Sequence, residues 1–322
     1  MFEHQIDPIF GQIAGFHLWW YGLSYSLGFL ALLYWFHLNR QRMNLSSREA
    51  VTLTGLICLG VLVGGRLVEV VFYEWDLYAI NFRYIPAYWL GGMSTHGILA
   101  GSIIAVYAYS FLRGVPFLKI TDQLVIPGAF IMGVGRLGNF ADGLIVGAPT
   151  DVWWGVNFPD TEGPRHPVVL YDGIKNLALV PFLIWLRAHS SKPGIVTAHF
   201  IFWYGFLRIF VDFFREYRVE AFGLGPGQGF NIAMAVLGLG LFIYVIRKQH
   251  SAGEGQEEHI PKREERPHTW QLLALSAVII FPLIIPSDWT QDVPARYGDR
   301  HSGLTYSSIY PEIPNRKPDK DS

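Results

Sequence analysis

Long apolar runs, separated by short polar segments, are the feature that most constrains this chain. Each of seven runs is close to the roughly 20 residues with which a helix crosses the hydrocarbon core of a membrane. They occupy residues 16–37, 50–73, 94–112, 123–143, 167–187, 195–214 and 229–246. A shorter, weaker eighth run covers residues 270–286 and ends in prolines. The pattern predicts an all-α polytopic membrane helix bundle with seven core transmembrane helices and an eighth candidate.

Composition supports a membrane protein and suggests four segments. Of the 322 residues, 51% are hydrophobic and 16% are charged, whereas an average soluble domain carries about 25% charged residues. The net charge of −1 provides no field that would favour nucleic acid, so we predict no nucleic-acid partner. We expect a transmembrane domain at 1–247, a charged cytoplasmic linker at 248–269, an extra transmembrane helix at 270–286 and a mostly disordered tail at 287–322.

Lysines and arginines predict the orientation, because cytoplasmic loops of membrane proteins carry an excess of them. They follow the first, third, fifth and seventh runs. The residues concerned are Arg40, Arg42, Arg48, Arg113, Lys119, Arg187, Lys192, Arg247 and Lys248. We therefore predict that these segments are cytoplasmic and that the amino terminus is external.

Ionisable side chains inside the runs mark candidate functional positions. Each costs at least about 2.5–3.5 kcal/mol on insertion scales, so each needs a partner, water or a function. Arg66, Glu69 and Tyr73 share one helical face in the second run. Two interpretations of Arg66 stay open: an internal ion pair with Glu69 that permits burial, or substrate binding.

A second polar stripe lies in the run at 195–214, where Tyr204, Arg208, Asp212 and Arg215 recur at helical spacing. Two arginines and one carboxylate leave a net positive face, and a guanidinium can donate two parallel hydrogen bonds to a phosphate. The stripe predicts binding of a phospholipid headgroup. The alternative is a set of arginines that extend to the headgroup layer and are neutralised by Asp212.

Glycines crowd the end of the fourth run, at residues 133–143, together with Arg136, Asn139 and Asp142. The spacing Gly-x-Gly-x-x-Gly does not indicate a dinucleotide site here, because that fingerprint requires a preceding strand. Small residues in a membrane span favour close helix packing. A broken helix end at this depth can also line a cavity.

His96 follows a Gly-Gly-Met-Ser-Thr segment at the predicted external start of the third run. Histidine is suited to proton transfer near neutral pH, so one interpretation is a general base and the other is a structural hydrogen-bonding residue. The chain has one cysteine, Cys58, and no His, Cys or carboxylate cluster at metal-ligand spacing. We therefore predict no metal and no cofactor.

Taken in order, these segments resemble the bacterial prolipoprotein diacylglyceryl transferase family from about residue 16 to residue 247. The matching segments are residues 20–25, 64–66, 91–97, 135–147, 165–167 with 171–172, and 204–215. Six such segments in the right order make the resemblance specific. It implies that the domain at 1–247 is catalytic.

The resemblance implies a transferase of the bacterial cytoplasmic (inner) membrane. Such an enzyme moves the diacylglyceryl group of phosphatidylglycerol to the lipobox cysteine thiol of a prolipoprotein, forming a thioether and releasing glycerol phosphate. Its partners would be phosphatidylglycerol, prolipoprotein lipobox segments and membrane lipid. The candidate catalytic residues are His96, Tyr21, Asn139 and Asp142. The candidates for binding phosphatidylglycerol are Arg136, Arg208, Asp212, Arg215 and Arg66.

The chain departs from the family pattern in two places. Leu144 stands where the family usually has a glutamate, and either Asp142 or Glu69 would be the substitute carboxylate. The residues beyond 250 also extend past the usual end of the family. Two alternatives therefore stay open: a divergent paralogue that acts on another phospholipid or acceptor, and a non-catalytic phospholipid-binding or transport protein.

Overall fold

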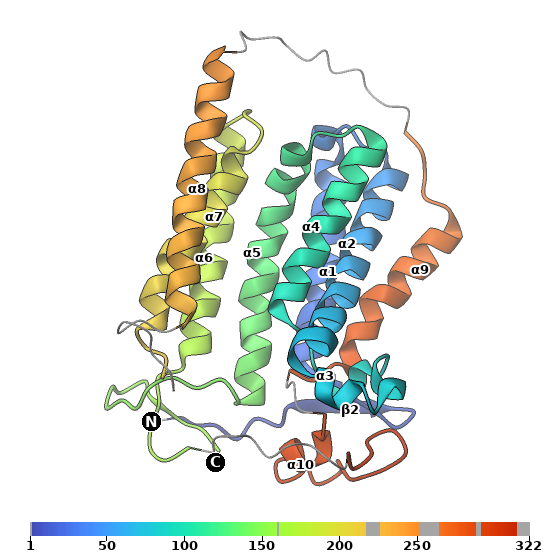
Figure 1. Cartoon of the computed structure of the whole chain (residues 1–322), viewed down its shortest axis with the longest axis vertical. Helices are drawn as coiled ribbons and strands as arrows, with labels where there is room; N and C mark the ends of the chain where they lie inside the picture. The colour runs from blue at the N-terminus through green and yellow to red at the C-terminus, as the bar shows by residue number, and fades with distance from the viewer. Residues whose placement is uncertain (1, 160, 217–225, 252–263, 288–290, 314–322) are drawn as a thin grey trace.

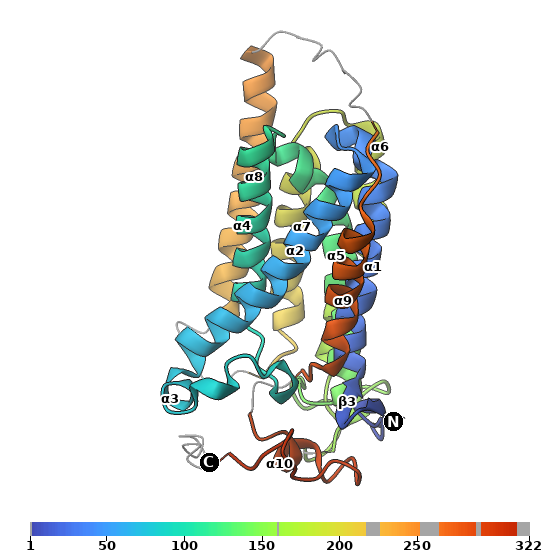
Figure 2. The same cartoon turned by 90° about the vertical axis from the view of Figure 1, so that its right-hand side faces the viewer.

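The computed structural model describes residues 2–159, 161–216, 226–251, 264–287 and 291–313, and within these ranges the chain forms a bundle of long helices (Figures 1 and 2). The long helices are α1 (Trp20–Asn39), α2 (Ser47–Val68), α4 (Thr95–Arg113), α5 (Phe117–Asp142), α6 (Val168–His189), α7 (Ile195–Asp212), α8 (Pro226–Ser251) and α9 (Thr269–Ile280). A π-helical turn, Glu69–Tyr73, extends α2, and α3 (Trp75–Tyr78) and α10 (Val293–Tyr297) are short.

Each of the eight apolar runs coincides with one of the long helices. By length and composition, six helices of the described chain can cross a membrane: α2 with its π turn, α4, α5, α6, α7 and α8. α1 has 20 residues, but its tryptophans, tyrosines and serines make it less apolar than these six. The apolar segment of α9 and the following 3-10 turn is shorter. The structure therefore supports a mostly helical membrane protein with six candidate spans.

Short strands lie at the end of the bundle where both chain termini are found (Figure 1). β2 (Ile9–Ile13) and β3 (Phe16–Trp19) form an antiparallel hairpin, and β1 (Phe2–Glu3) pairs in parallel with β4 (Val156–Asn157). The hairpin turns at Ala14 and Gly15, which both have positive φ. The all-α prediction thus missed a small strand layer, and residues 16–19 form a strand instead of the predicted start of the first helix.

Glycines bring α2 and α4 into backbone contact. Gly60 and Gly64 on α2 face Gly97 and Gly101 on α4, so a Cβ on Gly101 would overlap the Gly60 carbonyl and lie 3.2 Å from Gly64 Cα. Both pairs have the spacing of four residues that lets helices approach closely in membranes. This contact sets the position of the start of α4, which carries His96.

The glycine-dense segment of α5 packs against two other helices. A Cβ on Gly138 would lie 2.8 Å from Tyr21 Cα of α1, and a Cβ on Gly133 would lie 2.6 Å from the Leu177 side chain of α6. The prediction of close helix packing at residues 133–143 is therefore confirmed. The helix ends at Asp142 because Gly143 adopts the left-handed conformation, with φ +66°.

The end of the predicted linker docks on the connection between α1 and α2. The Arg48 guanidinium lies 2.9 Å from the Glu265 carboxylate and that of Arg40 lies 3.5 Å from Glu264. These contacts are at the opposite end of the bundle from the termini (Figure 1). Residues 252–263 of the predicted linker lie outside the described residues.

The chain after α9 folds back over the end of the bundle that carries the termini (Figures 1 and 2). Its apolar side chains join a buried cluster with Ile9, Trp19, Val70, Leu77, Tyr78, Ala87 and Leu90. The prediction of a mostly disordered tail is wrong for residues 291–313, whose buried apolar and aromatic side chains belong to this one cluster. Residues 288–290 and 314–322 lie outside the described residues.

Candidate active site

A single carboxylate, Asp172 of α6, lies among three cations. Its oxygens are 2.6 Å from Arg136 Nε of α5, 2.5 Å from Arg208 Nη1 of α7 and 2.9 Å from Lys175 Nζ one turn further along α6. The Asp172 side chain is only 1% exposed. A buried charge requires pairing, and here the pairing joins three helices at one point.

Three further polar residues, Asn139, Asp212 and Asn231, complete this arrangement. We name it the Asp172 cluster: Arg136, Asn139, Asp172, Lys175, Arg208, Asp212 and Asn231. Arg136 Nη1 donates to Asn139 Oδ1 at 3.1 Å, Arg208 Nε lies 3.2 Å from Asp212 Oδ1, and Asn231 Nδ2 donates to Asp212 Oδ2 at 2.7 Å. With three cations and two carboxylates, the cluster carries one net positive charge. It therefore favours an anionic ligand.

Glycines allow the helices of the cluster to approach one another. A Cβ on Gly173 would lie 3.2 Å from Arg136 Cβ, so a larger residue there would push α6 away from α5. On α7, a Cβ on Gly205 would lie 2.6 Å from the Asn231 carbonyl of α8. The small residues thus bring the long cationic side chains within ion-pair distance.

A small hollow opens beside the cluster. It is lined by Arg136, Ile145, Val168, Val169, Asp172, Arg208 and Arg215. The Arg136 side chain is 26% exposed, and its Nη2 has no hydrogen-bond partner among the described residues. That nitrogen is an available donor at the mouth of the cluster. Three of the predicted phospholipid-binding arginines, Arg136, Arg208 and Arg215, therefore line one hollow.

The loop between α5 and α6 contributes Ile145 to the lining of this hollow. His166 Nδ1 lies 3.0 Å from the Tyr171 hydroxyl, and the His166 ring packs on Phe214 at 4.9 Å. Partial burial lowers the pKa of His166, so this histidine is neutral over most of the physiological range. The loop also pairs with the segment after α7, through an isolated bridge between Gly147 and Arg215.

His96 lies outside the Asp172 cluster, at the start of α4. The Ser94 side chain caps this helix end by accepting from the Gly97 amide at 3.4 Å. His96 Nδ1 is 3.0 Å from the Tyr73 hydroxyl, and its exposed ring lies 6.3 Å from that of Phe230 on α8. Phe230 precedes Asn231, the partner of Asp212, so His96 and the cluster flank the same first turns of α8.

Tyr21 and Asp142 lie on the α1 side of α5. Tyr21 Oη hydrogen-bonds with Tyr25 Oη at 2.7 Å, next to the contact between α1 and Gly138. Asp142 is completely buried, and its main-chain carbonyl accepts a hydrogen bond from Arg300. Of the predicted catalytic residues, Asn139 belongs to the Asp172 cluster, through its hydrogen bond with Arg136.

Arg66 organises a loop of backbone and lies apart from the Asp172 cluster. Its guanidinium donates to five carbonyl groups, those of Tyr84, Ile85, Ala87, Gly91 and Gly92, and packs on the rings of Tyr78 and Tyr88. The predicted ion pair between Arg66 and Glu69 does not occur among the described residues. Glu69 is buried beside Gly92, and the carbonyl groups accept the hydrogen bonds of the Arg66 guanidinium in its place.

Sequence reasoning missed Lys175 and Asn231. Lys175 could have been found from the sequence, because a lysine within a membrane span needs a partner and Asp172 lies one helical turn before it. Its Nζ also lies 3.9 Å from the centre of the Tyr204 ring. Asn231 could not have been found in this way, since a single uncharged amide at the start of a span does not need a charged partner.

Leu144 is not among the residues that line the hollow beside the Asp172 cluster. It packs against the apolar cluster that contains Val293, Tyr297 and Leu304 of the C-terminal segment. The position where the family usually has a glutamate therefore serves as an apolar contact in this protein.

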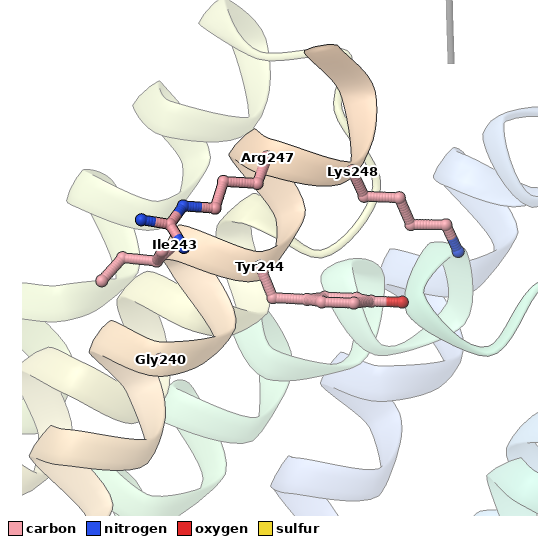
Figure 3. A pocket seen from close by; sticks show the side chains of 5 residues that line it. All are labelled: Gly240, Ile243, Tyr244, Arg247 and Lys248. Carbon is pink, nitrogen blue, oxygen red and sulfur yellow. The ribbon is translucent and has the colours of Figure 1, made fainter. Parts of the chain in front are cut away.

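A second hollow lies at the other end of α8 and is lined by Gly240, Ile243, Tyr244, Arg247 and Lys248 (Figure 3). Arg247 is 16 residues from Asn231, which corresponds to about 24 Å along a helix. All five residues lie on one helix, and the Arg247 and Lys248 side chains are exposed. This is the arrangement expected for basic side chains that reach the headgroup layer.

Within the described ranges, no group of three or more metal-ligating residues comes together.

The fold and the cluster define a helical membrane protein with a net positive, partly open site built from α5, α6, α7 and α8. The family model for prolipoprotein diacylglyceryl transferase matches residues 8–244. The chain belongs to this family.

Curated relatives agree with the family assignment. The chain is 35% identical over 261 residues to the phosphatidylglycerol–prolipoprotein diacylglyceryl transferase of Pseudoalteromonas atlantica, covering 78% of this chain and 93% of that protein. The enzyme of the same name from Bordetella parapertussis is 38% identical over 256 residues, covering 76% and 97%. That of Nitrosomonas europaea is 36% identical over 256 residues, covering 76% and 91%.

Proposed function

We propose that this protein transfers the diacylglyceryl group from phosphatidylglycerol to the lipobox cysteine thiol of prolipoproteins, forming a thioether and releasing glycerol phosphate. The observation that carries the proposal is the Asp172 cluster on the family scaffold. It is a net positive site in which Arg136 keeps a donor nitrogen available beside the hollow. Glycerol phosphate is the leaving group of the reaction, so a site for its phosphate is the main requirement.

The cluster supports leaving-group stabilisation by donors that are already in place. Asp172 orients Arg136 and Arg208 through hydrogen bonds of 2.6 and 2.5 Å, and Asn139 fixes a second nitrogen of Arg136. Donors fixed before the reaction stabilise developing charge without reorganising. Arg215 at the rim of the hollow and Asp212, which orients Arg208, complete the proposed phosphatidylglycerol site.

The nucleophile is the lipobox thiol, which must lose its proton to react. We assign the general base to His96, which is exposed and held by Tyr73 at 3.0 Å. In this proposal Tyr21 and Asp142 hold the side of α5 that faces α1, close to Asn139. Arg66 acts on this reaction indirectly, by holding the loop that leads to His96.

The proposed topology places the site toward the external side of the inner membrane of a bacterium. Counting α1, seven helices cross, and α9 is the eighth. The amino terminus and the C-terminal segment are external, and the basic connections at the other end of the bundle are cytoplasmic. Lipobox segments and membrane lipid meet the protein from that external side.

The test is transfer of labelled diacylglyceryl from phosphatidylglycerol to a lipobox peptide by the purified protein. We expect Arg136→Ala and Asn139→Ala each to lower kcat by about 100-fold or more, as expected for loss of a donor to a developing charge. Arg83→Ala is the matched control, because the Arg83 guanidinium lies over the Tyr84 ring, away from the cluster.

Two outcomes would contradict the proposal. Full transfer activity in Arg136→Ala would show that the Asp172 cluster takes no part in the reaction. No transfer by the unchanged protein, beside an active family member, would favour phosphatidylglycerol binding without covalent chemistry or a different acceptor.

A further inference from the structure

The chain beyond the family match returns to the catalytic end of the bundle. The family model ends at residue 244. α9 then packs along α2 and α1, and the residues after it cover the end of the bundle where the amino terminus lies (Figures 1 and 2). We name residues 281–287 and 291–313 the C-terminal segment.

The C-terminal segment touches three of the segments that resemble the family. Gly22, next to Tyr21, has no space for a side chain, because a Cβ there would overlap the Pro282 carbonyl and lie 2.9 Å from that of Leu283. Gln291 reaches Gly92, where a Cβ would lie 3.0 Å from its Nε2. Arg300 reaches Asp142 at the end of α5.

Polar contacts hold the C-terminal segment to the strand layer and to the loop before α4. Trp89 Nε1 donates to the Ile309 carbonyl at 2.8 Å, His301 Nδ1 lies 2.6 Å from the Asp7 carboxylate, and the His17 amide donates to the Tyr310 hydroxyl at 3.0 Å. Val293 and Tyr297 are completely buried. The segment therefore has a defined position.

Arg300 acts at the end of the helix that carries Arg136 and Asn139. The last carbonyl groups of a helix lack partners within the helix, and a cation there is favourable. His4 donates to the Phe140 carbonyl, with 2.6 Å between Nε2 and the oxygen, and Arg300 Nη1 donates to the Asp142 carbonyl. Asp142 is one turn after Asn139, so these bonds fix the turn from which Asn139 holds Arg136.

Leu144 lies two residues after Asp142 and packs against the buried apolar cluster that Val293, Tyr297 and Leu304 of the C-terminal segment help to form. A charged glutamate at this position would place an ionised group against that cluster, at a large desolvation cost. The leucine at 144 therefore suits the apolar cluster to which the C-terminal segment contributes.

We propose that the C-terminal segment is a built-in cap of the active site and that Arg300 is a positioning residue for the transfer reaction. By holding the end of α5, Arg300 keeps Asn139 and Arg136 in the geometry that receives the phosphate. This inference rests on the proposed transfer activity and adds to it a part of the chain that lies outside the family match.

The experiment compares Arg300→Ala, Arg300→Lys and Arg296→Ala in the full-length protein. Arg296 is an exposed arginine of the same segment and serves as the matched control. We expect Arg300→Ala to lower kcat roughly tenfold, the scale of one hydrogen bond to a charged group, with an unchanged KM for phosphatidylglycerol. Arg300→Lys keeps a cation that can donate to Asp142 and restores most of the rate.

Amide hydrogen exchange of residues 136–147 in lipid nanodiscs measures how firmly the end of α5 is held. This measurement does not depend on transfer activity. We expect faster exchange there in Arg300→Ala and unchanged exchange in Arg300→Lys and Arg296→Ala. Unchanged kcat together with unchanged hydrogen exchange in Arg300→Ala would contradict the proposed cap. A loss of rate in Arg300→Ala that Arg300→Lys does not restore would also contradict it. If the unchanged protein transfers nothing, the proposed function fails, and exchange alone then decides whether Arg300 holds α5.

Discussion

At the scale of single residues, Asp172 has the most partners in the candidate site. It accepts from Arg136 and Arg208 and pairs with Lys175, while its side chain is almost fully buried. An isolated buried cation is strongly unfavourable, so removing the shared anion leaves three cations that repel one another. Asp172 therefore supports the fold as well as the proposed site.

We predict that Asp172→Asn destabilises the folded protein by about 3–5 kcal/mol, the range for breaking a buried ion pair by removing one partner. The measurement is unfolding in mixed micelles of mild detergent and dodecyl sulfate, followed by helical circular dichroism. Asp151→Asn, which alters an exposed loop carboxylate, is the control. Equal stability of the two variants would show that the three cations do not depend on Asp172.

Several site residues could be predicted from the sequence because burying a charge in a membrane span is costly. Arg136, Arg208 and Asp212 were found in this way, and the structure brings them together. The role of Asp172 as shared partner could not be predicted, since it depends on the relative rotation of α5, α6 and α7. The partners of Arg66 could not be predicted for a similar reason. The sequence indicates that this buried arginine needs a partner, but it does not show that backbone carbonyl groups of a later loop fill this role.

At the scale of elements, glycines determine where helices meet. The contact between α2 and α4 joins Gly60 and Gly64 to Gly97 and Gly101 without intervening side chains. The apolar runs predicted each of the long helices, because membrane-crossing length is a strong constraint. The strand layer was missed because its strands are short, and β3 lies within residues 16–37, which the apolar pattern predicted as one continuous helix.

We predict that Gly101→Ala destabilises the protein by about 1–3 kcal/mol, the usual cost of overpacking. The new methyl group would overlap the Gly60 carbonyl, so α2 and α4 must separate. Gly55→Ala is the control, because a Cβ at Gly55 on the same α2 helix meets no atom within 4 Å. Unfolding in mixed micelles measures both, and equal midpoints would contradict a tight contact between α2 and α4.

At the scale of the whole molecule, two segments far apart in the sequence meet at the end of α5. His4 from the amino-terminal segment and Arg300 from the C-terminal segment donate to the carbonyl groups of Phe140 and Asp142 in the last turn of that helix. Burial lowers the pKa of His4, the bond to the Phe140 carbonyl opposes this shift, and the nearby Arg300 charge adds to it. The folded protein therefore binds a proton at His4 less readily than the unfolded chain does.

This shift predicts a pH dependence of stability. An unfolded histidine has a pKa of about 6.5, and the folded value is lower, so the unfolded chain binds more protons as the pH falls through that range. The contribution of His4 to stability is fully present above about pH 6.5 and is lost as the pH falls toward the folded pKa. We expect a smaller loss of stability between about pH 7.5 and pH 5.5 in His4→Gln than in the unchanged protein.

Unfolding midpoints of both proteins at the two pH values measure this difference. His17 and His166 also have lowered pKa values because of burial, and they are present in both proteins, so the comparison isolates His4. Identical pH dependence of the two proteins would show that His4 does not titrate with folding.

The contact between the Tyr310 hydroxyl and the His17 amide joins residues 293 positions apart. During synthesis the chain emerges from its amino terminus, and contacts between distant residues form only after both partners exist. Every helix of the Asp172 cluster is therefore made before the C-terminal segment, and a newly made protein passes through a stage in which the end of α5 lacks Arg300. A chain that ends before residue 300 would contain the whole Asp172 cluster but would lack the arginine that donates to the Asp142 carbonyl at the end of α5.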